Sequence, residues 1–407
     1  MHEDAALERF RSSVGEPAWH RLADRLAAVN RDIKTLGIRD FEGGAGLLTG
    51  YSYGEFYDWD LYFENVYMSY YGISSHCRTN LDAFLDRQVE CGFVARTLVQ
   101  PRWRQHFKPF LAQIALLGSR QDDGFDWLAG RRYERLGKYL DYWFWHQDFD
   151  RNGLCVWDSA DHSGMDNQDR RAGRLFSMTV EGVDLNCYLV RELEAMAVIA
   201  DGLGRDGDAA GFAAHASDLA GLINGTFWDE DDGFYYDRNE RTGQPVRVRS
   251  VAGFVPLWAG IAPKERAEHL VKGHLLDRNE FWRPYPVATW ARSEPDYYQE
   301  PTHGECNWRG PAWVPTNYMV FHGLVRYGFD EAARELAYRT FEMALSEPRT
   351  REFYNAETGG GLGLDPFWGW SALAYCMPLE YELGYDPTDI VRERIVPIAR
   401  DILKVAF

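Results

Sequence analysis

The sequence predicts an all-α fold in which about twelve helices pair into a closed ring, an (α/α)6 toroid. Apolar residues recur at helical spacing in stretches along the whole chain, whereas strand patterns are few and short. The connecting segments are rich in tryptophan and carboxylates, as expected where loops at one end of a ring build a functional site. A helical-repeat solenoid is the alternative, and the sequence has no fixed-period repeat that favours it.

The stretch 178–201 gives the longest helical pattern. Its residues Val183, Val190 and Leu193 share one face, and Gly202 provides a stop directly after it. The other predicted helices cover residues 18–36, 60–72, 78–91, 107–118, 130–146, 209–225, 264–275, 312–327, 330–346, 368–384 and 388–404, and extended stretches at 233–237 and 245–249 predict small hairpins.

Length and composition narrow the class of protein. The 407 residues contain no linker or low-complexity run, so a single domain over residues 1–407 is the simplest organisation. The net charge of −18 disfavours nucleic acids and anionic membranes as partners. No apolar run approaches the roughly 18 residues of a membrane helix, and no signal-peptide pattern is present, so we expect a cytoplasmic protein. The six cysteines lack Cys-x-x-Cys spacing, which disfavours a zinc site or a disulfide framework.

Five loop segments combine tryptophan with carboxylates or amides. The flat faces of tryptophan rings pack against the C–H surfaces of sugars while polar groups bind hydroxyls, so the segments together predict a sugar-binding cleft. The segment 157–169 contains four aspartates. Three interpretations are open for it: a solvated acidic loop, a metal site, or a loop that carries a catalytic acid. The five segments are residues 54–63, 97–104, 157–169, 304–317 and 352–363 with 367–371.

These segments resemble the inverting glycosidases of the trehalase and processing α-glucosidase superfamily, glycoside hydrolase families 37 and 63. The resemblance covers roughly residues 50–375. Tyr57-Asp-Trp-Asp-Leu-Tyr-Phe63 is similar to a trehalase signature, Ser163-Gly-Met-Asp-Asn167 to the general-acid segment, Asn307-Trp-Arg-Gly-Pro-Ala-Trp313 to a Trp-Arg-Gly-Pro-x-Trp run, and Glu352-Phe-Tyr-Asn355 with Gly369-Trp-Ser371 to the general-base segment.

The sequence also departs from the trehalase pattern. The second trehalase signature, with Asp after Trp, is absent at Trp308–Arg309, and a Ser-Ala-Asp-His run stands where family members have Glu before Ser-Gly. The compact length is closer to bacterial family 63 enzymes that cleave glucosylglycerate or mannosylglycerate. The resemblance therefore implies an inverting glycoside hydrolase that acts on an α-linked glucoside or mannoside of a small molecule, a disaccharide or a glycerate glycoside of this kind.

Inverting hydrolysis needs two carboxyl groups in opposite protonation states, about 6.5–9.5 Å apart so that a water molecule fits between base and sugar. The resemblance assigns the general acid to Asp166 and the general base to Glu352. Glu357, in the turn that follows, is the rival base. No cofactor is required for this chemistry.

The resemblance also implies which residues hold the sugar. Trp59, Trp308 and Trp370 are candidates for the walls of the pocket or for the core, and Asp60 and Gln100 for hydroxyl binding. An arginine among Arg102, Arg104, Arg174 and Arg309 either holds an anionic aglycone or pairs with nearby carboxylates. The full set of candidate substrate-binding residues is Tyr57, Trp59, Asp60, Gln100, Trp103, Trp308, Arg309, Trp313 and Trp370.

The run Asp148-Phe-Asp-Arg-Asn-Gly153 matches the start of a calcium loop, Asp-x-Asp-x-Asn-Gly. Position twelve is Ser159 rather than the bidentate Glu. The run is therefore a structural calcium site at Asp148, Asp150 and Asn152 or an Asx-rich turn.

Two other functions stay open from the sequence. A sugar isomerase or epimerase on the same ring needs bases, often a histidine pair, and His106, His162 and His303 lie in or beside the candidate loops without a spacing that pairs them. A non-catalytic sugar-binding protein needs the tryptophans but no acid and base. The presence of both Asp166 and Glu352 favours the hydrolase.

Overall fold

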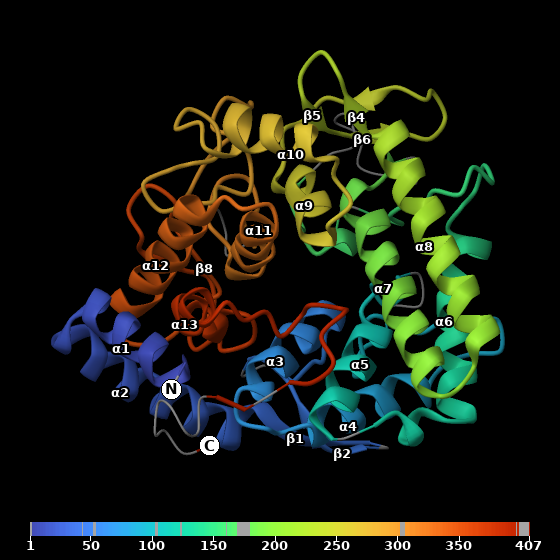
Figure 1. Ribbon diagram of the computed structural model, residues 1–407, viewed down its shortest axis with the longest axis horizontal. Coiled ribbons are helices and arrows are strands. Elements are labelled where there is room, and N and C mark those ends of the chain that lie inside the picture. Colours follow the sequence, from blue (N-terminus) through green and yellow to red (C-terminus); the bar gives the residue numbers. More distant parts are fainter. Residues whose placement is uncertain are drawn as a thin grey trace.

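The structure is a computed structural model that describes residues 2–42, 44–51, 54–101, 105–122, 124–159, 161–168, 180–301, 306–395, 397–398 and 407. Over these residues the chain is mainly helical, and Figure 1 looks into a ring of helices. No helix in the described ranges is long and apolar enough to cross a membrane.

The inner layer of the ring is continuous within the described part of the chain. Each inner segment contacts the next, and the last contacts the first, so the layer closes on itself. The inner segments are α3 (Asp58–Ser69), α5 (Leu111–Gln121), α7 (Val183–Gly202), α9 (Val255–Ala259), α11 (Val314–Arg326) and the 3-10 turn η6 (Ser371–Tyr375) with α13 (Met377–Leu383).

The outer layer of helices packs against the inner one. For example, α8 packs on α7, α12 packs on α11 and α13, and the N-terminal α1 packs on α13. The predicted ring of helix pairs is therefore confirmed. The outer helices are α1 (His2–Val14), α2 (Glu16–Asp32), α4 (Ser75–Leu85), α6 (Arg131–His146), α8 (Asp206–Thr226), α10 (Lys264–Leu270) and α12 (Asp330–Ser346). The remaining helical segments are short: the π-helical turns η1 (Ile33–Gly37) and η5 (Val271–Leu275), and the 3-10 turns η2 (Asp126–Leu128), η3 (Asp161–Ser163) and η4 (Val251–Phe254).

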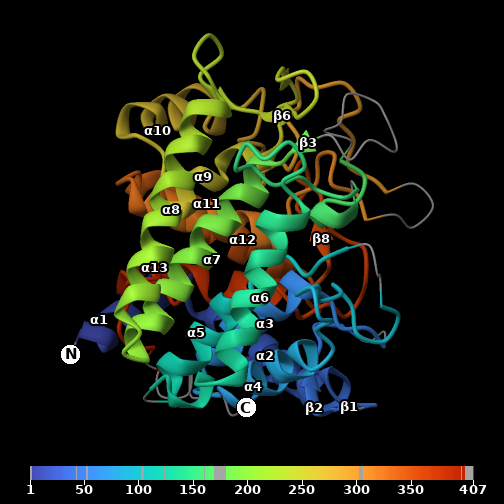
Figure 2. The same ribbon diagram turned by 90° about the vertical axis from the view of Figure 1, so that its right-hand side faces the viewer.

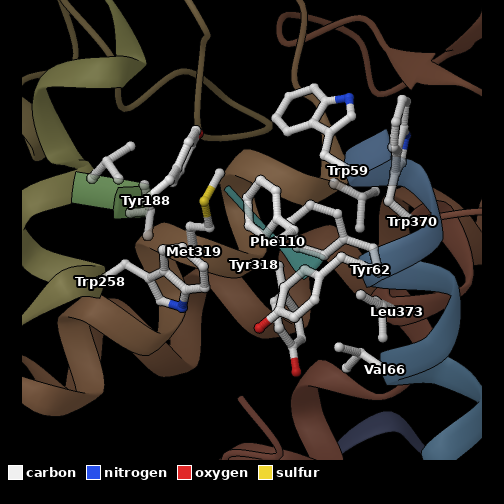
Figure 3. Packing of buried hydrophobic residues seen from close by; sticks show 14 of the residues in the cluster. Trp59, Tyr62, Val66, Phe110, Tyr188, Trp258, Tyr318, Met319, Trp370 and Leu373 are labelled. Carbon is white, nitrogen blue, oxygen red and sulfur yellow. The ribbon is translucent and has the colours of Figure 1, made fainter. Parts of the chain in front are cut away.

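Burial separates the two layers. All residues of α3 are buried, whereas α8 buries only Ala216, Leu219 and Ile223 along one stripe. A helix that is covered on every side needs apolar residues all round, and a surface helix needs one apolar face. Figure 3 shows the result, with Tyr62 of α3 and Trp258 of α9 among the aromatic side chains that gather inside the ring.

The strands are short and antiparallel. The hairpin predictions at 233–237 and 245–249 correspond to β5, β6 and β7. The pairs are β1 (Ile38–Phe41) with β2 (Gly44–Leu48), β4 (Trp228–Asp229) with β5 (Phe234–Tyr235), β8 (Phe353–Tyr354) with β9 (Gly361–Leu362), and the three-stranded sheet of β3 (Val180–Glu181), β6 (Asp237–Asn239) and β7 (Pro245–Val246).

Three sequence-based helix assignments need correction. The helix α1 and the short inner helix α9 were not predicted. The predicted helix 388–404 is wrong over its described residues, which form turns and irregular chain. Asp386 Oδ1 accepts both the N–H and the hydroxyl of Thr388, at 2.8 and 2.7 Å, and Arg120 donates to the Asp389 carbonyl at 2.7 Å. These local bonds use the backbone groups that a helix would pair.

Candidate active site

A pocket of about 510 Å³ opens at the end of the ring where inner helices begin. Tyr57 and Trp313 immediately precede α3 and α11, and Trp370 precedes η6. In Figure 2 this end of the ring faces right, where β3 and β8 lie. The residues that line the pocket are Tyr57, Trp59, Asp60, Arg96, Gly164, Asp166, Cys306, Trp308, Trp313, Glu352 and Trp370.

Glu352 reaches the pocket because its segment is fixed to the start of α11. Ala312 and Tyr354 exchange two backbone N–H to carbonyl hydrogen bonds of 2.8 and 3.0 Å, so the Glu352 segment runs beside the chain that leads into α11. The indole N–H of Trp370 donates to the Glu352 carbonyl at 3.1 Å. The side chain is 6% exposed, and it faces the cavity.

Two groups hold the Glu352 carboxylate. The Leu364 N–H donates to Oε2 at 2.9 Å, and the Cys306 thiol donates to Oε1 at 3.5 Å. Burial raises the pKa of Glu352 above its usual range, the two hydrogen bonds oppose this shift, and the charge of Asp166 adds to it. At Gly363, where φ is +69°, a Cβ atom would lie 2.4 Å from Glu352 Oε2, so the close approach requires glycine.

Glu357 lies outside the pocket lining, and its carboxylate is held by an arginine. Arg283 donates to both oxygens of Glu357, at 2.8 and 2.9 Å, and the Tyr297 hydroxyl donates to Oε1 at 2.6 Å. The Arg283 hydrogen bond is the largest cause that lowers the pKa of Glu357. Of the two candidate bases, Glu352 is the one that the structure brings to the cavity beside Asp166.

Asp166 lies on a segment that is fastened to the motif at 307–309. The side chain of Asn167 donates to Asn307 Oδ1 at 3.1 Å and accepts the Trp308 N–H at 2.7 Å. Arg309 Nε donates to the Asn167 carbonyl at 2.7 Å. Two motifs that are far apart in sequence are thus locked together at the pocket, and Arg309 serves as a clamp beside the lining rather than as part of it.

The first turn of α3 places a buried group of charges under the pocket. Asp58 Oδ1 accepts a hydrogen bond from Lys108 Nζ at 2.8 Å, and both side chains are completely buried. Burial raises the pKa of Asp60 to about 8, and Asp58 adds to the shift. Burial opposes the ionisation of Asp58, but Lys108 and Arg96 outweigh it and lower its pKa. At neutral pH the carboxyl group of Asp60 can therefore be protonated, and it can then donate a hydrogen bond as well as accept one.

Tryptophan rings form the other walls. The rings of Trp308 and Trp313 stack with centroids 3.7 Å apart, and Trp313 stacks on Phe353 at 4.5 Å. Trp59 packs against both Trp308 and Trp370 at 5.7 Å. Each of the four tryptophans is at most 4% exposed, so the walls are fixed by packing in the core as well as facing the cavity.

The structure brings most of the predicted site residues to the pocket, with three exceptions. Gln100 is exposed and lies away from the lining, and Arg309 is the clamp described above. Trp103 lies outside the described residues, as do Arg102, Arg104, Arg174 and His303.

The pocket also contains residues that the sequence did not single out as functional. These are Arg96, Gly164 and Cys306. Gly164 has φ of +84°, and a Cβ there would lie 2.7 Å from the Trp59 ring, which explains a glycine two residues before Asp166. Gly164 and Cys306 were visible as members of the motif segments, whereas Arg96 precedes its segment by one residue and gave no signal of its own.

The described histidines of the candidate loops are absent from the pocket lining. His106 is buried, and burial lowers its pKa to about 3. His162 Nε2 lies 2.6 Å from the His106 carbonyl, and Nδ1 lies 3.2 Å from Asp158. Both rings are therefore engaged in the packing of their loops, away from the cavity.

The run that matches a calcium loop closes on itself by hydrogen bonds. The Asp148 carboxylate accepts the N–H groups of Asn152 and Gly153 at 3.1 and 3.0 Å, and Asn152 Nδ2 donates to Asp150 and Glu181 at 3.0 and 2.6 Å. In the part of the chain that the structure describes, no three His, Cys, Asp or Glu side chains form a group that could hold a metal ion. The contacts are those of an Asx-rich turn, and calcium binding stays a prediction.

Two solved structures with a similar fold are a mannosylglycerate hydrolase and a trehalase. The mannosylglycerate hydrolase of family 63 from Thermus thermophilus, in complex with glucose, has a TM-score of 0.69 at 20% identity, covering 88% of this chain and 98% of that one. Neutral trehalase Nth1 from Saccharomyces cerevisiae has a TM-score of 0.66 at 19% identity, covering 84% of this chain and 76% of that one. At this identity the likeness concerns the fold, which is an (α/α)6 toroid.

The sequence identifies the family. A family model described as the mannosylglycerate hydrolase MGH1-like glycoside hydrolase domain matches residues 57–371, a range that contains every residue lining the pocket. The chain therefore belongs to this family of glycoside hydrolases.

Individual relatives match over shorter stretches. Mannosylglycerate hydrolase from Thermus thermophilus is 34% identical over 148 residues, 36% of this chain and 33% of that protein. Mannosylglycerate hydrolase MGH1 from Selaginella moellendorffii is 30% identical over 197 residues, 47% of this chain and 37% of that protein. Cytosolic neutral trehalase from Kluyveromyces lactis is 40% identical over 119 residues, 29% of this chain and 15% of that protein. The matches thus span between 15% and 37% of the relatives' own length.

Proposed function

We propose that this chain is an inverting glycoside hydrolase that cleaves an α-linked glucoside or mannoside of a small molecule. The observation that carries the proposal is that Asp166 and Glu352 line one pocket whose other walls are mostly aromatic. Two carboxyl groups on opposite sides of a sugar site can supply a proton to the leaving group and remove one from water. Membership of the glycoside hydrolase family supports the same reaction class.

In the proposed reaction, protonated Asp166 gives its proton to the glycosidic oxygen. The bond from the anomeric carbon to this oxygen breaks, and the aglycone leaves as an alcohol. A water molecule attacks the anomeric carbon from the opposite face and gives a proton to ionised Glu352. The configuration inverts because attack and departure are on opposite faces, and proton exchange with solvent restores both carboxyl groups.

Other residues position the sugar in this proposal. Trp59, Trp308 and Trp370 offer flat apolar faces to the ring, and Asp60 binds hydroxyls. The Leu364 N–H fixes Oε2 of the base, which limits how the carboxylate can rotate. No step uses a cofactor, so turnover should be unchanged after treatment with a chelator.

Glycosides of glycerate are the first substrates to examine, together with small α-linked disaccharides. Relatives of this chain are named mannosylglycerate hydrolases, and one solved neighbour is a complex with Tris and D-glycerate. Four tryptophan rings line the pocket, and flat rings of this kind pack on the faces of a sugar. Both features support a substrate of one sugar ring with a small aglycone.

Proton NMR of the reaction tests the proposal. The protein is incubated with mannosylglycerate, glucosylglycerate and α,α-trehalose, and the first anomer of the released sugar is followed. Free β-anomer appearing first from an α-glycoside supports inversion. Retained configuration, isomerisation without hydrolysis, or binding of these glycosides without turnover contradicts the proposal and favours a retaining enzyme, an isomerase or a sugar-binding protein respectively.

A further inference from the structure

Arg96 occupies a place in the pocket that the reaction above does not use. It is the one cationic side chain among the described residues that line the cavity, and it is only 5% exposed. Isolated backbone bridges on both sides, Ala95 with His106 and Thr97 with Tyr57, fix the position of its backbone. A desolvated charge in a fixed position acts strongly on its neighbours.

The guanidinium of Arg96 connects two parts of the site. Nη1 donates to the Asp161 carbonyl at 2.6 Å and to Gln105 Oε1 at 3.3 Å. Nε lies 3.7 Å from Asp58 Oδ2, and the Tyr57 ring centroid is 5.4 Å from the guanidinium carbon. Asp58 belongs to the first turn of α3, and Asp161 begins the turn that leads to the acid, so one side chain joins the two segments.

The charges around Arg96 come from the same two segments. Burial opposes the charge of the guanidinium, but Asp58, Asp166, Asp161 and Asp60 outweigh it and raise its pKa above the ordinary arginine value. The interaction is reciprocal, because a positive charge that is favoured by nearby carboxylates in turn favours their ionised forms.

Three further ionisable groups face this cluster. Lys108 is a second buried cation. Burial lowers its pKa to about 8, and the charge of Arg96 adds to this shift. Glu352 and Cys306 line the same pocket as Asp166; burial raises the pKa of both groups, and the charge of Asp166 adds to the shift. The charges of Asp166 and Glu352 therefore act on one another.

We propose that Arg96 is a positioning residue for the general acid: it ties the turn that carries Asp166 to the start of α3 and keeps a positive charge beside the acid. The inference rests on the acid role of Asp166 proposed above. The positive charge repels the proton of the acid, so Arg96 helps to set the pH above which the acid loses this proton. Loss of this proton produces the alkaline limb of the pH–rate profile, where the rate falls as pH rises.

The test is the pH dependence of kcat/KM for wild type, Arg96→Gln and Arg96→Lys. Gln removes the charge, so the alkaline limb should move to higher pH by about one unit. Lys keeps the charge but not the guanidinium geometry, so the limb should stay close to its wild-type position while turnover falls, by on the order of 10²-fold for a misplaced acid.

A leaving-group series provides a second readout that needs only the folded Lys variant. A glycosyl fluoride has a leaving group that does not need the acid, so the Lys variant should recover most of its lost turnover on this substrate. A general loss of structure would lower turnover on both substrates equally, and that result would overturn the inference.

Arg120→Gln is the matched control. Arg120 is 6% exposed and donates to backbone carbonyls of Asp389 and Ile390 at the other end of the ring, so its loss should lower stability and leave the alkaline limb in place.

An alkaline limb that is the same in Arg96→Gln as in wild type, or that moves equally in both Arg96 variants, overturns the inference. If Asp166→Asn keeps turnover, the acid assignment itself fails; if Asp166→Asn is inactive and the limb does not move, only the role of Arg96 fails.

Discussion

The two ends of the ring hold the same kinds of charged side chain in opposite situations. At the pocket end, Asp60, Asp166 and Glu352 face a cavity that is open to a ligand. At the other end, Glu380 accepts hydrogen bonds from the hydroxyls of Tyr70 and Tyr318, the latter at 2.9 Å, and its Oε2 lies 2.8 Å from His322 Nε2.

The chain after α13 accounts for much of the difference. It crosses the ring in Figure 1, and its backbone carbonyls accept hydrogen bonds from Arg120 and Arg191 of the inner helices. Burial raises the pKa of Glu380 as it does that of Glu352. A raised pKa therefore marks burial at both ends. Glu380 also lines a cavity, but its carboxylate is held by Tyr318 and His322. Glu352 instead shares its pocket with a second carboxyl group and with tryptophan rings.

Removal of either carboxyl group at the pocket should have the largest effect. Asp166→Asn cannot deliver a proton and Glu352→Gln cannot activate water, so each should lower turnover by about 10²- to 10⁴-fold. Substrate binding, measured by calorimetry, should survive in both variants. On a glycosyl fluoride Asp166→Asn should recover much of its rate, whereas Glu352→Gln should not. Near-native turnover in both variants would show that the chemistry lies elsewhere.

At the opposite end, loss of a carboxyl group should affect stability instead. Glu380→Ala leaves the hydroxyls of Tyr70 and Tyr318 and the ring of His322 without their buried partner, which should lower the free energy of unfolding by about 3 kcal/mol. Urea unfolding measures this change, and kcat of the folded fraction should stay at the wild-type value.

Glu380→Gln is the control for that substitution, because its amide oxygen still accepts from both tyrosines. It should lose much less stability than Glu380→Ala. Equal stability of Glu380→Ala and wild type, or a loss of kcat in the folded Ala variant, would remove the distinction between the two ends.

The pocket end was the easier part to predict from sequence. Trp59, Asp166, Trp308 and Glu352 each lie in a short segment with an unusual combination of residue types. Such a combination can be recognised in the sequence without knowledge of the fold. Helical periodicity predicted the ring for the same reason, since it is a local property of the chain.

Contacts between distant segments were not predictable in this way. Asp58 is paired with Lys108 and Glu380 with His322, and nothing in the sequence around these residues names the partner. Gln100 is instructive because its backbone N–H donates to Glu55 at 2.9 Å, while the residue is exposed and is not part of the pocket lining. The helical pattern after residue 388 was overruled by such contacts as well.

A smaller effect should follow from Cys306, which is next to the base rather than part of it. Its thiol hydrogen bond lowers the pKa of Glu352 against the larger effect of burial, which raises it. In the proposed reaction Glu352 works ionised, so the rate should fall as pH drops through this pKa, and the acid limb should lie above the ordinary Glu value of 4.5. Cys306→Ala removes the donor, so the limb should move to higher pH by up to about one unit.

The measurement is the acid limb of kcat/KM, with Cys306→Ser as the control that keeps a donor. The Ser variant should restore a limb close to that of wild type. An acid limb in Cys306→Ala that moves to lower pH, or does not move, would mean that the thiol does not act on the base.

The smallest effect should come from Glu357→Gln, although this residue lies only five positions from the base. Its carboxylate is committed to Arg283 and Tyr297 and lies outside the pocket lining, so removal of its charge weakens a partly exposed ion pair and touches no reacting atom. We expect turnover within about threefold of wild type and a stability loss of about 1 kcal/mol or less, as for other partly solvated ion pairs. Steady-state kinetics and urea unfolding of Glu357→Gln beside Glu352→Gln make the comparison with the same chemical change at both positions. If Glu357→Gln is the inactive variant and Glu352→Gln is active, the base is Glu357, and the loop must rearrange on substrate binding to release it from Arg283.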